Sequence, residues 1–171
     1  MIVLDSSPLI YLGKSNALFI IRELYGYALI PPLVYKEVVE VGGRKGFEDA
    51  EAVKNEIGEL LIVQHPHEET IRDIEDDAEK KNFHLGKGEI EGIALCIDTN
   101  SIFVSDDDDA KRYAETRTIS SKGTIYLLLR AYKDKIISKD VCARTFEEIV
   151  EKGLWISLEI INVFHKRLGE M

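Results

Sequence analysis

Four consecutive carboxylates follow an apolar run in the second half of the chain. The stretch IFVSDDDD, residues 102–109, places Asp106 to Asp109 directly after three apolar residues and a serine. Adjacent carboxylates repel each other by about 1 kcal/mol per pair in water, and by several times more near a protein surface. Helix capping compensates for one or two of them. A divalent cation compensates for more, because it binds carboxylate oxygens, so the stretch is a candidate for metal chemistry.

A fifth carboxylate holds a similar position near the start of the chain. Asp5 directly follows the apolar run Ile2 to Leu4. In an open parallel sheet, ligands bind beyond the carboxyl ends of the strands. If the two apolar runs form neighbouring strands, Asp5 and the aspartate cluster face each other. One acidic site would then arise from two distant segments.

A glutamate in the next part of the chain lies beside an apolar helix face. Prolines 31 and 32 open a helix, in which Val34, Val38 and Val41 form an apolar stripe. At about 100° per residue, Glu37 lies next to this stripe. A carboxylate at a buried margin is costlier than one in open water. Taken alone, the residue is better explained as a solvated helix position.

Two further glutamates stand at the start of a strongly apolar helix, LGKGEIEGIALCI, residues 85–97. The glycines of this stretch are expected to loosen the helix start, so that Glu89 and Glu91 need not point in opposite directions. Complementarity to the helix dipole is the simpler explanation. However, the apolar residues that follow leave little exposed face, and buried carboxylates are costly unless they are protonated or bind metal.

The elements that position these residues alternate between strands and helices, which predicts an α/β fold with a parallel sheet of four to five strands. Short apolar runs predict strands at residues 2–4, 27–30, 60–63 and 102–104. Helices are predicted between them at residues 16–26, 31–43, 47–59, 70–82 and 85–97. The C-terminal part is predicted to be helical, at residues 109–116, 122–134, 138–153 and 157–169. At 171 residues, we expect one domain over residues 1–171.

The composition limits the classes of protein to consider. The apolar fraction of 45% and the charged fraction of 31% are typical of a soluble globular protein. No apolar run approaches the roughly 20 residues that cross a bilayer, and the opening lacks a basic signal-peptide region, so we expect a cytoplasmic protein without a membrane partner. Cys96 and Cys142 have no CxxC spacing, which argues against a zinc site. The net charge of −9 means that any binding of nucleic acid needs local basic residues or a bridging metal.

In their order along the chain, the acidic segments resemble the four motifs of the PIN-domain family, metal-dependent nucleases that include VapC-type toxins. The matching segments are IVLDSSPLI, IPPLVYKEV, LGKGEIEGIALC and FVSDDDDAKRYA. The third is similar to the LGxGExEAI-type motif of an archaeal and bacterial subgroup, and the final GLWISLEIINVFHKRLGE is similar to that subgroup's closing helix. The resemblance therefore covers nearly the whole chain. One departure is Ser120-Ser121-Lys122 before Gly123, where relatives carry a glycine-threonine turn.

The resemblance implies a set of site residues. Those with a catalytic role are Asp5, Glu37, Glu89 and Asp107. Those that bind Mg²⁺ or Mn²⁺ are Asp5, Glu89, Glu91, Asp106 and Asp107, with Asp109 as the alternative to Asp106. Ser6 and Ser105 are expected to orient carboxylates or water by hydrogen bonding. Asp108 is left to cap a helix or to face solvent.

The resemblance also implies an activity, an endoribonuclease that leaves a 5′-phosphate and a 3′-hydroxyl. Lys14, Lys87 and Lys111 are the basic residues nearest the motifs and are candidates for holding RNA. The apolar-rich helix at 16–26 favours a homodimer, and an antitoxin is a further expected partner. The alternative is a non-catalytic PIN-fold protein that binds RNA or acts as a scaffold. A receiver domain is disfavoured, because receivers carry paired acidic residues at the first strand and this strand ends in one aspartate. A HAD-type phosphatase is disfavoured, because it needs a second aspartate two residues after the first and that position is Ser7.

Overall fold

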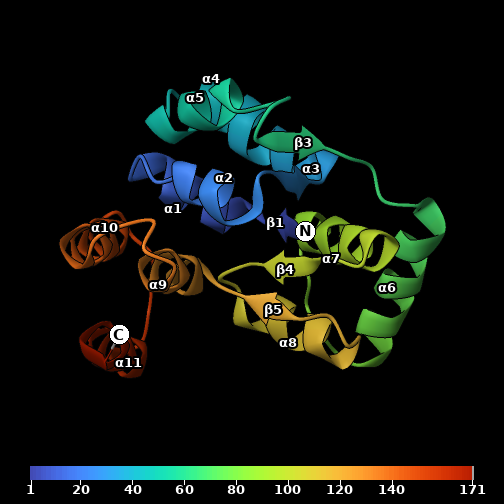
Figure 1. Cartoon of the computed structure of the whole chain (residues 1–171). Helices are drawn as coiled ribbons and strands as arrows, with labels where there is room; N and C mark the ends of the chain where they lie inside the picture. Colours follow the sequence, from blue (N-terminus) through green and yellow to red (C-terminus); the bar gives the residue numbers. More distant parts are fainter. Residues whose placement is uncertain (171) are drawn as a thin grey trace.

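Five short parallel strands form the central sheet (Figure 1). The computed structural model describes residues 1–170, and its strands are β1 (Ile2–Leu4), β2 (Ala28–Ile30), β3 (Leu61–Val63), β4 (Ile102–Val104) and β5 (Ser121–Lys122). Their order across the sheet is β3-β2-β1-β4-β5. The prediction of a four- to five-stranded parallel sheet is confirmed. The fifth strand was not predicted, and its second residue, Lys122, had been assigned to the start of the predicted helix at 122–134.

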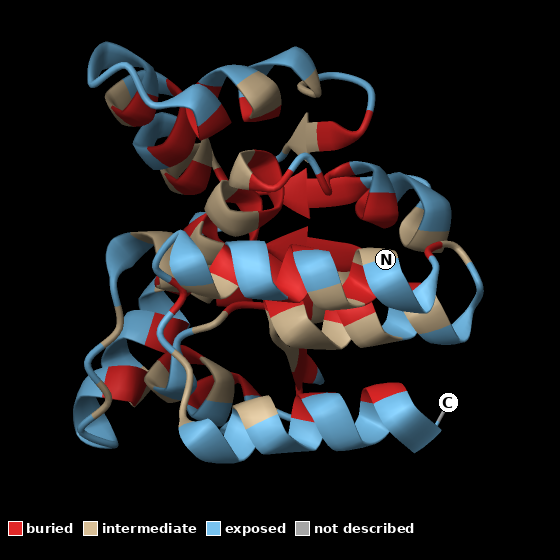
Figure 2. Cartoon of the chain, turned by 90° about the vertical axis from the view of Figure 1, so that its left-hand side faces the viewer, coloured by how far each residue is buried: buried red, intermediate tan, exposed pale blue. Residues whose placement is uncertain are grey.

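The strands β1 to β4 are apolar throughout because both faces of the sheet are covered there. Successive side chains of a strand point to opposite faces. Ile2 and Leu4 accordingly belong to the core on one face, whereas Val3 belongs to the core on the other. All three are fully buried. Figure 2 shows the strands as the most continuously buried part of the molecule, with the helices exposed on their outer faces.

Helices cover both faces of the sheet and make up the C-terminal part, as predicted (Figure 1). Those before β3 are α1 (Ser6–Lys14), α2 (Phe19–Tyr25), α3 (Pro32–Tyr35), the π-helical segment η1 (Lys36–Val41), α4 (Gly42–Arg44) and α5 (Glu48–Asn55). Those after β3 are α6 (Glu68–Lys80), α7 (Lys87–Thr99), α8 (Asp108–Thr116), α9 (Thr124–Lys133), α10 (Lys139–Glu151) and α11 (Leu158–Glu170). Within residues 1–170, no helix combines the length and the apolar character that a membrane span requires.

The helix α1 was not among the predicted helices. Asp5 caps this helix through the backbone N–H of Ser6. A proline is tolerated in a first turn, where its missing N–H has no partner within the helix. The predicted helix at 16–26 is correspondingly shorter, because Asn16 has a φ of +50°, outside the helical range.

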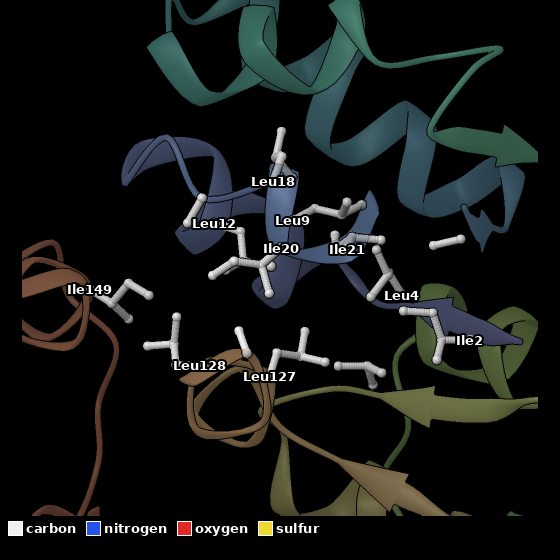
Figure 3. Close-up of a cluster of buried hydrophobic side chains, with 14 of the residues drawn as sticks. Ile2, Leu4, Leu9, Leu12, Leu18, Ile20, Ile21, Leu127, Leu128 and Ile149 are labelled. Carbon is white, nitrogen blue, oxygen red and sulfur yellow. The ribbon is translucent and has the colours of Figure 1, made fainter. Parts of the chain in front are cut away.

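The larger core lies between the sheet and the helices α1, α2, α9 and α10 (Figure 3). Leu9 and Leu12 of α1 meet Leu127 and Leu128 of α9 in the interior, together with Ile2 and Leu4 of β1 and further apolar residues of α2 and α10. All six of these leucine and isoleucine side chains are fully buried. The helix that begins beside Asp5 is therefore fixed to the C-terminal half of the chain.

The smaller core, on the opposite face, brings α7 unusually close to β4. A Cβ atom built on Gly92 of α7 would lie 2.9 Å from a ring carbon of Phe103, which is fully buried in β4. Real Cβ atoms essentially never approach that closely. Gly92 therefore permits α7 to pack closely on β4. This packing determines how far α7, and the Glu89 side chain that it carries, lie from the sheet.

A larger side chain at Gly92 should destabilise the protein. Gly92→Val forces Phe103 or the helix to move, and overpacking of this kind costs about 1–3 kcal/mol. Gly43→Val is the matched control, because Gly43 is also helical but a Cβ there meets no atom within 4 Å. Urea unfolding of both variants measures the difference. Equal free energies of unfolding would contradict the role assigned to this contact.

Candidate active site

The pairing of β1 with β4 brings the two acidic segments together. Leu4 is in register with Val104, and the backbone N–H of Asp5 donates to the carbonyl of Val104 at 2.9 Å. The carboxyl ends of parallel strands lie at one edge of a sheet. Asp5 and the aspartate cluster that begins at Asp106 therefore occupy the same edge, on adjacent strands, as the sequence analysis required.

Asp5 is buried, with 7% of its surface exposed. Its Oδ1 accepts from the Ser6 N–H at 2.8 Å, and its Oδ2 accepts from the Ser105 hydroxyl at 2.7 Å. Burial raises the pKa of Asp5, although these two hydrogen bonds oppose the rise. The negative charges of Glu37 and Asp106 raise the pKa further. The carboxyl group is thus held rigidly in a place where its charge is unfavourable.

Glu37 reaches the same site from η1. Its Oε2 accepts from the Ser6 hydroxyl at 2.8 Å, so one serine contacts both Asp5 and Glu37. A π-helical turn is rare and is frequent at functional sites, because the extra residue changes which side chains face inward. The sequence placed Glu37 beside the apolar stripe, and the structure turns its carboxylate toward Asp5.

Glu89 comes from the first turn of α7. Its Oε2 accepts from the backbone N–H of Gly86 at 2.7 Å, which completes the N-terminal cap of this helix. Partial burial raises the pKa of Glu89 to about 7, and the charges of Asp5, Asp107 and Glu37 raise it as well. Glu89 therefore changes its protonation near neutral pH, chiefly because it is partly buried and to a lesser degree because of the other three carboxylates.

Glu91 lies elsewhere, contrary to the expectation that the glycines would let both glutamates approach one site. Its Oε2 accepts from the backbone N–H of Leu33 at 2.9 Å, in the first turn of α3. Residues two apart on a helix point in widely different directions, and α7 is regular from Lys87 onward. The position of Glu91 thus follows from ordinary helical geometry, and its side chain fastens α3 to α7.

The first two aspartates of the cluster are held by several hydrogen bonds. Asp107 caps α8, because its Oδ1 accepts from the Ala110 N–H at 2.8 Å. Both oxygens of Asp106 accept from Thr124, one from the backbone N–H at 2.8 Å and the other from the hydroxyl at 2.6 Å. The Asp106 N–H in turn donates to Ser7 at 3.2 Å. Capping is therefore a task of Asp107, not of Asp108.

The last two aspartates are directed more toward solvent. The Asp108 side chain is 79% exposed and forms an ion pair with Lys111. The Asp109 side chain is 49% exposed and forms an ion pair with Arg112. These pairs leave Asp106 as the better-ordered companion of Asp107. The repulsion within the four aspartates is thus relieved by backbone and hydroxyl donors for two of them and by basic side chains for the other two.

These acidic residues line one open pocket of about 690 Å³. Its acidic lining residues are Asp5, Glu37, Glu89 and Asp106 to Asp109. Of the three lysines considered for RNA, Lys87 lines the pocket. Lys111 is engaged by Asp108, and Lys14 lies over the ring of Tyr11. The pocket therefore has an acidic floor with little basic compensation.

The chemistry of these donors fits an oxygen-seeking cation. Carboxylate oxygens are the ligands that Mg²⁺ and Mn²⁺ prefer. The charges of neighbouring carboxylates, after the larger effect of burial, raise the pKa of both Asp5 and Glu89, and a bound cation would offset that repulsion. Across residues 1–170, however, no three acidic, histidine or cysteine side chains stand close enough together to form a ready-made coordination group. The carboxylates that could bind a cation therefore line one pocket, but they are not arranged around a common point.

Three residues of the site were missed in the sequence. Ser7 and Thr124 hold Asp106, and Trp155 stands at the pocket rim. The pair Gly123-Thr124 is itself a glycine-threonine turn before α9, placed after the fifth strand. A Cβ on Gly123 would lie 2.9 Å from an Asp106 oxygen, so a glycine is needed there. This pair was the available signal in the sequence, and it lies directly after the Ser120-Ser121-Lys122 segment where the turn was expected.

Stability should depend on pH through Glu89. Its pKa rises from the usual 4.5 to about 7 on folding. The folded state therefore holds the proton more tightly, and the resulting stability is complete below about pH 4.5 and is lost as the pH rises through about 7. In EDTA, the free energy of unfolding of the wild type should fall across this range. The free energy of unfolding of Glu89→Gln should fall less. Glu69→Gln, an exposed glutamate in the first turn of α6, should behave as the wild type. Identical slopes for all three proteins would contradict the assignment.

The chain was compared with models of protein families and with curated proteins. A family model described as a PIN domain matches residues 1–170. A search of curated proteins found no significant match. The parallel sheet, the flanking helices and the acidic pocket at the carboxyl edge agree with that family, whose members are generally nucleases. The chain therefore belongs to the PIN-domain family.

Proposed function

We propose that this protein is an endoribonuclease that depends on Mg²⁺ or Mn²⁺. The observation that carries the proposal is the convergence of Asp5, Glu37, Glu89 and Asp107, from four separate elements, on one pocket. Unneutralised carboxylates lower the stability of a fold. A set that serves no structural purpose would be expected to scatter over the surface instead. Hydrolysis of a phosphodiester is a chemistry that uses such a set.

In this proposal, the four carboxylates hold the cation, with Asp106 as a further ligand. When bound, a divalent cation activates a water molecule and neutralises charge on the phosphate. Ser6 fixes Asp5 through its N–H and Glu37 through its hydroxyl, and Ser105 fixes Asp5 from the opposite side. Glu89, with a pKa of about 7, would lose its proton on metal binding, because metal and proton compete for the same oxygens.

The proposal extends to partners that a polyanionic substrate requires. Lys87 is the lysine best placed to meet the RNA backbone, since it lines the pocket. Lys14 and Lys111 remain secondary candidates. A homodimer would add basic residues to one groove, and Phe19 of α2, which is 43% exposed, offers apolar surface for it. We further propose that the protein acts in the cytoplasm as a VapC-like toxin and that an antitoxin protein binds it.

The alternative is a PIN-fold protein that binds RNA without cutting it. The absence, within residues 1–170, of a ready-made coordination group favours this alternative. The tight hydrogen bonding around Asp5 and Asp106 favours the enzyme, because it holds the acidic groups in one arrangement. Activity measurements separate the two.

Cleavage of RNA should require both the metal and Asp5. Purified protein with Mg²⁺ or Mn²⁺ should shorten a labelled RNA, and EDTA should stop the reaction. Asp5→Asn should lower the rate by roughly 100-fold or more, since even groups that only orient metal ligands contribute about 10–100-fold. The asparagine is nearly isosteric, and circular dichroism checks that the variant is folded.

Asp108→Asn is the matched control for this experiment. Asp108 belongs to the same aspartate cluster, but its side chain is 79% exposed and pairs with Lys111. The rate of this variant should stay within a few-fold of the wild type. Cleavage that survives both chelation and Asp5→Asn would instead identify a contaminating nuclease. Binding of RNA without any cleavage would support the non-catalytic alternative.

Metal binding should also raise the melting temperature without any RNA. A cation at ten times its dissociation constant stabilises the folded state by about 1.4 kcal/mol. At about pH 8, where Glu89 is ionised, MgCl₂ should raise the melting temperature of the wild type and of Asp108→Asn but should affect Asp5→Asn much less. Differential scanning fluorimetry measures the shift. The same increase in all three proteins would mean a general salt effect.

A further inference from the structure

The rim of the acidic pocket carries the single tryptophan of the chain, Trp155. This side chain is 85% exposed. Its neighbour Leu154 is buried, with 6% of its surface exposed. An indole ring left in water forgoes a large part of the free energy that burial would contribute. A buried neighbour and an exposed ring on a pocket rim suggest a surface that becomes covered when a ligand binds.

The backbone that presents Trp155 is fixed to α1. The Tyr11 hydroxyl donates to the Gly153 carbonyl at 3.0 Å, and the Lys152 ammonium donates to the Lys14 carbonyl. The Leu154 N–H closes the end of α10 by donating to Ile149 at 3.1 Å. Gly153 has a φ of +105°, a conformation that favours glycine. The ring is therefore carried by an ordered turn that is held to the same helix as Asp5.

The surroundings of Trp155 explain why an aromatic side chain suits this position. The floor of the pocket is acidic and the net charge of the chain is −9, so phosphates are repelled over most of the surface. An aromatic ring binds a nucleobase by stacking, which needs no charge and depends little on base identity. Such a contact supplies affinity for nucleic acid without neutralising the carboxylates that hold a metal.

We infer that Trp155 stacks on an unpaired nucleobase of the substrate strand and thereby selects single-stranded RNA at this pocket. The inference rests on the proposed function for the identity of the substrate. Bases within a duplex are stacked on their own neighbours, so a side chain at the rim cannot reach their faces. Trp155 acts as a specificity residue and contacts a base beside the acidic floor, not the phosphate that is cut.

Because no other tryptophan exists in the chain, its fluorescence reports on this contact alone. The experiment uses the Asp5→Asn protein with Mg²⁺, so that RNA remains uncut, and a 12-nucleotide RNA of mixed sequence. The single strand should quench the emission in a saturable manner. The same RNA annealed to its complement should quench it much less. Equal quenching by both forms, or by neither, would overturn the inference.

Variants test whether the ring contributes to binding. With a labelled single strand and fluorescence anisotropy, Trp155→Leu should weaken binding by about tenfold or more, and Trp155→Phe should restore most of the loss. Leu158→Ala is the matched control, because Leu158 is 78% exposed nearby but does not line the pocket. In cleavage assays, Trp155→Leu should raise KM and leave kcat within a few-fold. An unchanged KM would contradict the inference.

The outcomes separate this inference from the proposed function. Cleavage by the wild type without quenching in the Asp5→Asn protein would overturn the role of Trp155 and leave the nuclease intact. Quenching by single strands without any cleavage would overturn the nuclease and leave the stacking contact intact. Emission that shifts on dilution of the protein without RNA would place Trp155 in a contact between two copies of the chain, which overturns the inference.

Discussion

The structure depends on holding like charges together at the carboxyl edge of a parallel sheet. The pairing of β1 with β4 fixes Asp5 beside the aspartate cluster, and the hydroxyl of Ser105 joins the two by donating to Asp5 and accepting from the Asp107 N–H. Electrostatics opposes this arrangement. The surrounding fold supplies the opposing free energy, through the two apolar cores on either face of the sheet and through neutral donors aimed at each carboxylate.

Neutral donors, not basic side chains, hold the residues at the centre of the pocket. Asp5, Glu37 and Asp106 each accept hydrogen bonds from serine or threonine. Ion pairs appear further out, at Asp108 and Asp109. A hydroxyl or an N–H orients a carboxylate and leaves its charge available, whereas a lysine would cancel it. This division is what a site for a cation requires.

The sequence predicted the parts of the fold that follow from local patterns. Continuous apolar runs predicted four strands, and acidic residues at the ends of two runs predicted an acidic pocket at one edge of the sheet, because both signals are local. The strand at Ser121 was missed, since two polar residues carry no apolar pattern. The direction of Glu91 was missed because the glycines were expected to loosen the start of α7, which is instead a regular helix. The rim formed by Tyr11 and Trp155 joins segments 144 residues apart, which no local pattern reveals.

The contact between Tyr11 and Gly153 has a consequence for synthesis of the protein. Asp5 leaves the ribosome well before the turn that carries Trp155. A growing chain therefore has no complete pocket until its C-terminal helices emerge and pack on α1. The order of emergence thus makes formation of the pocket rim a late step of folding during synthesis.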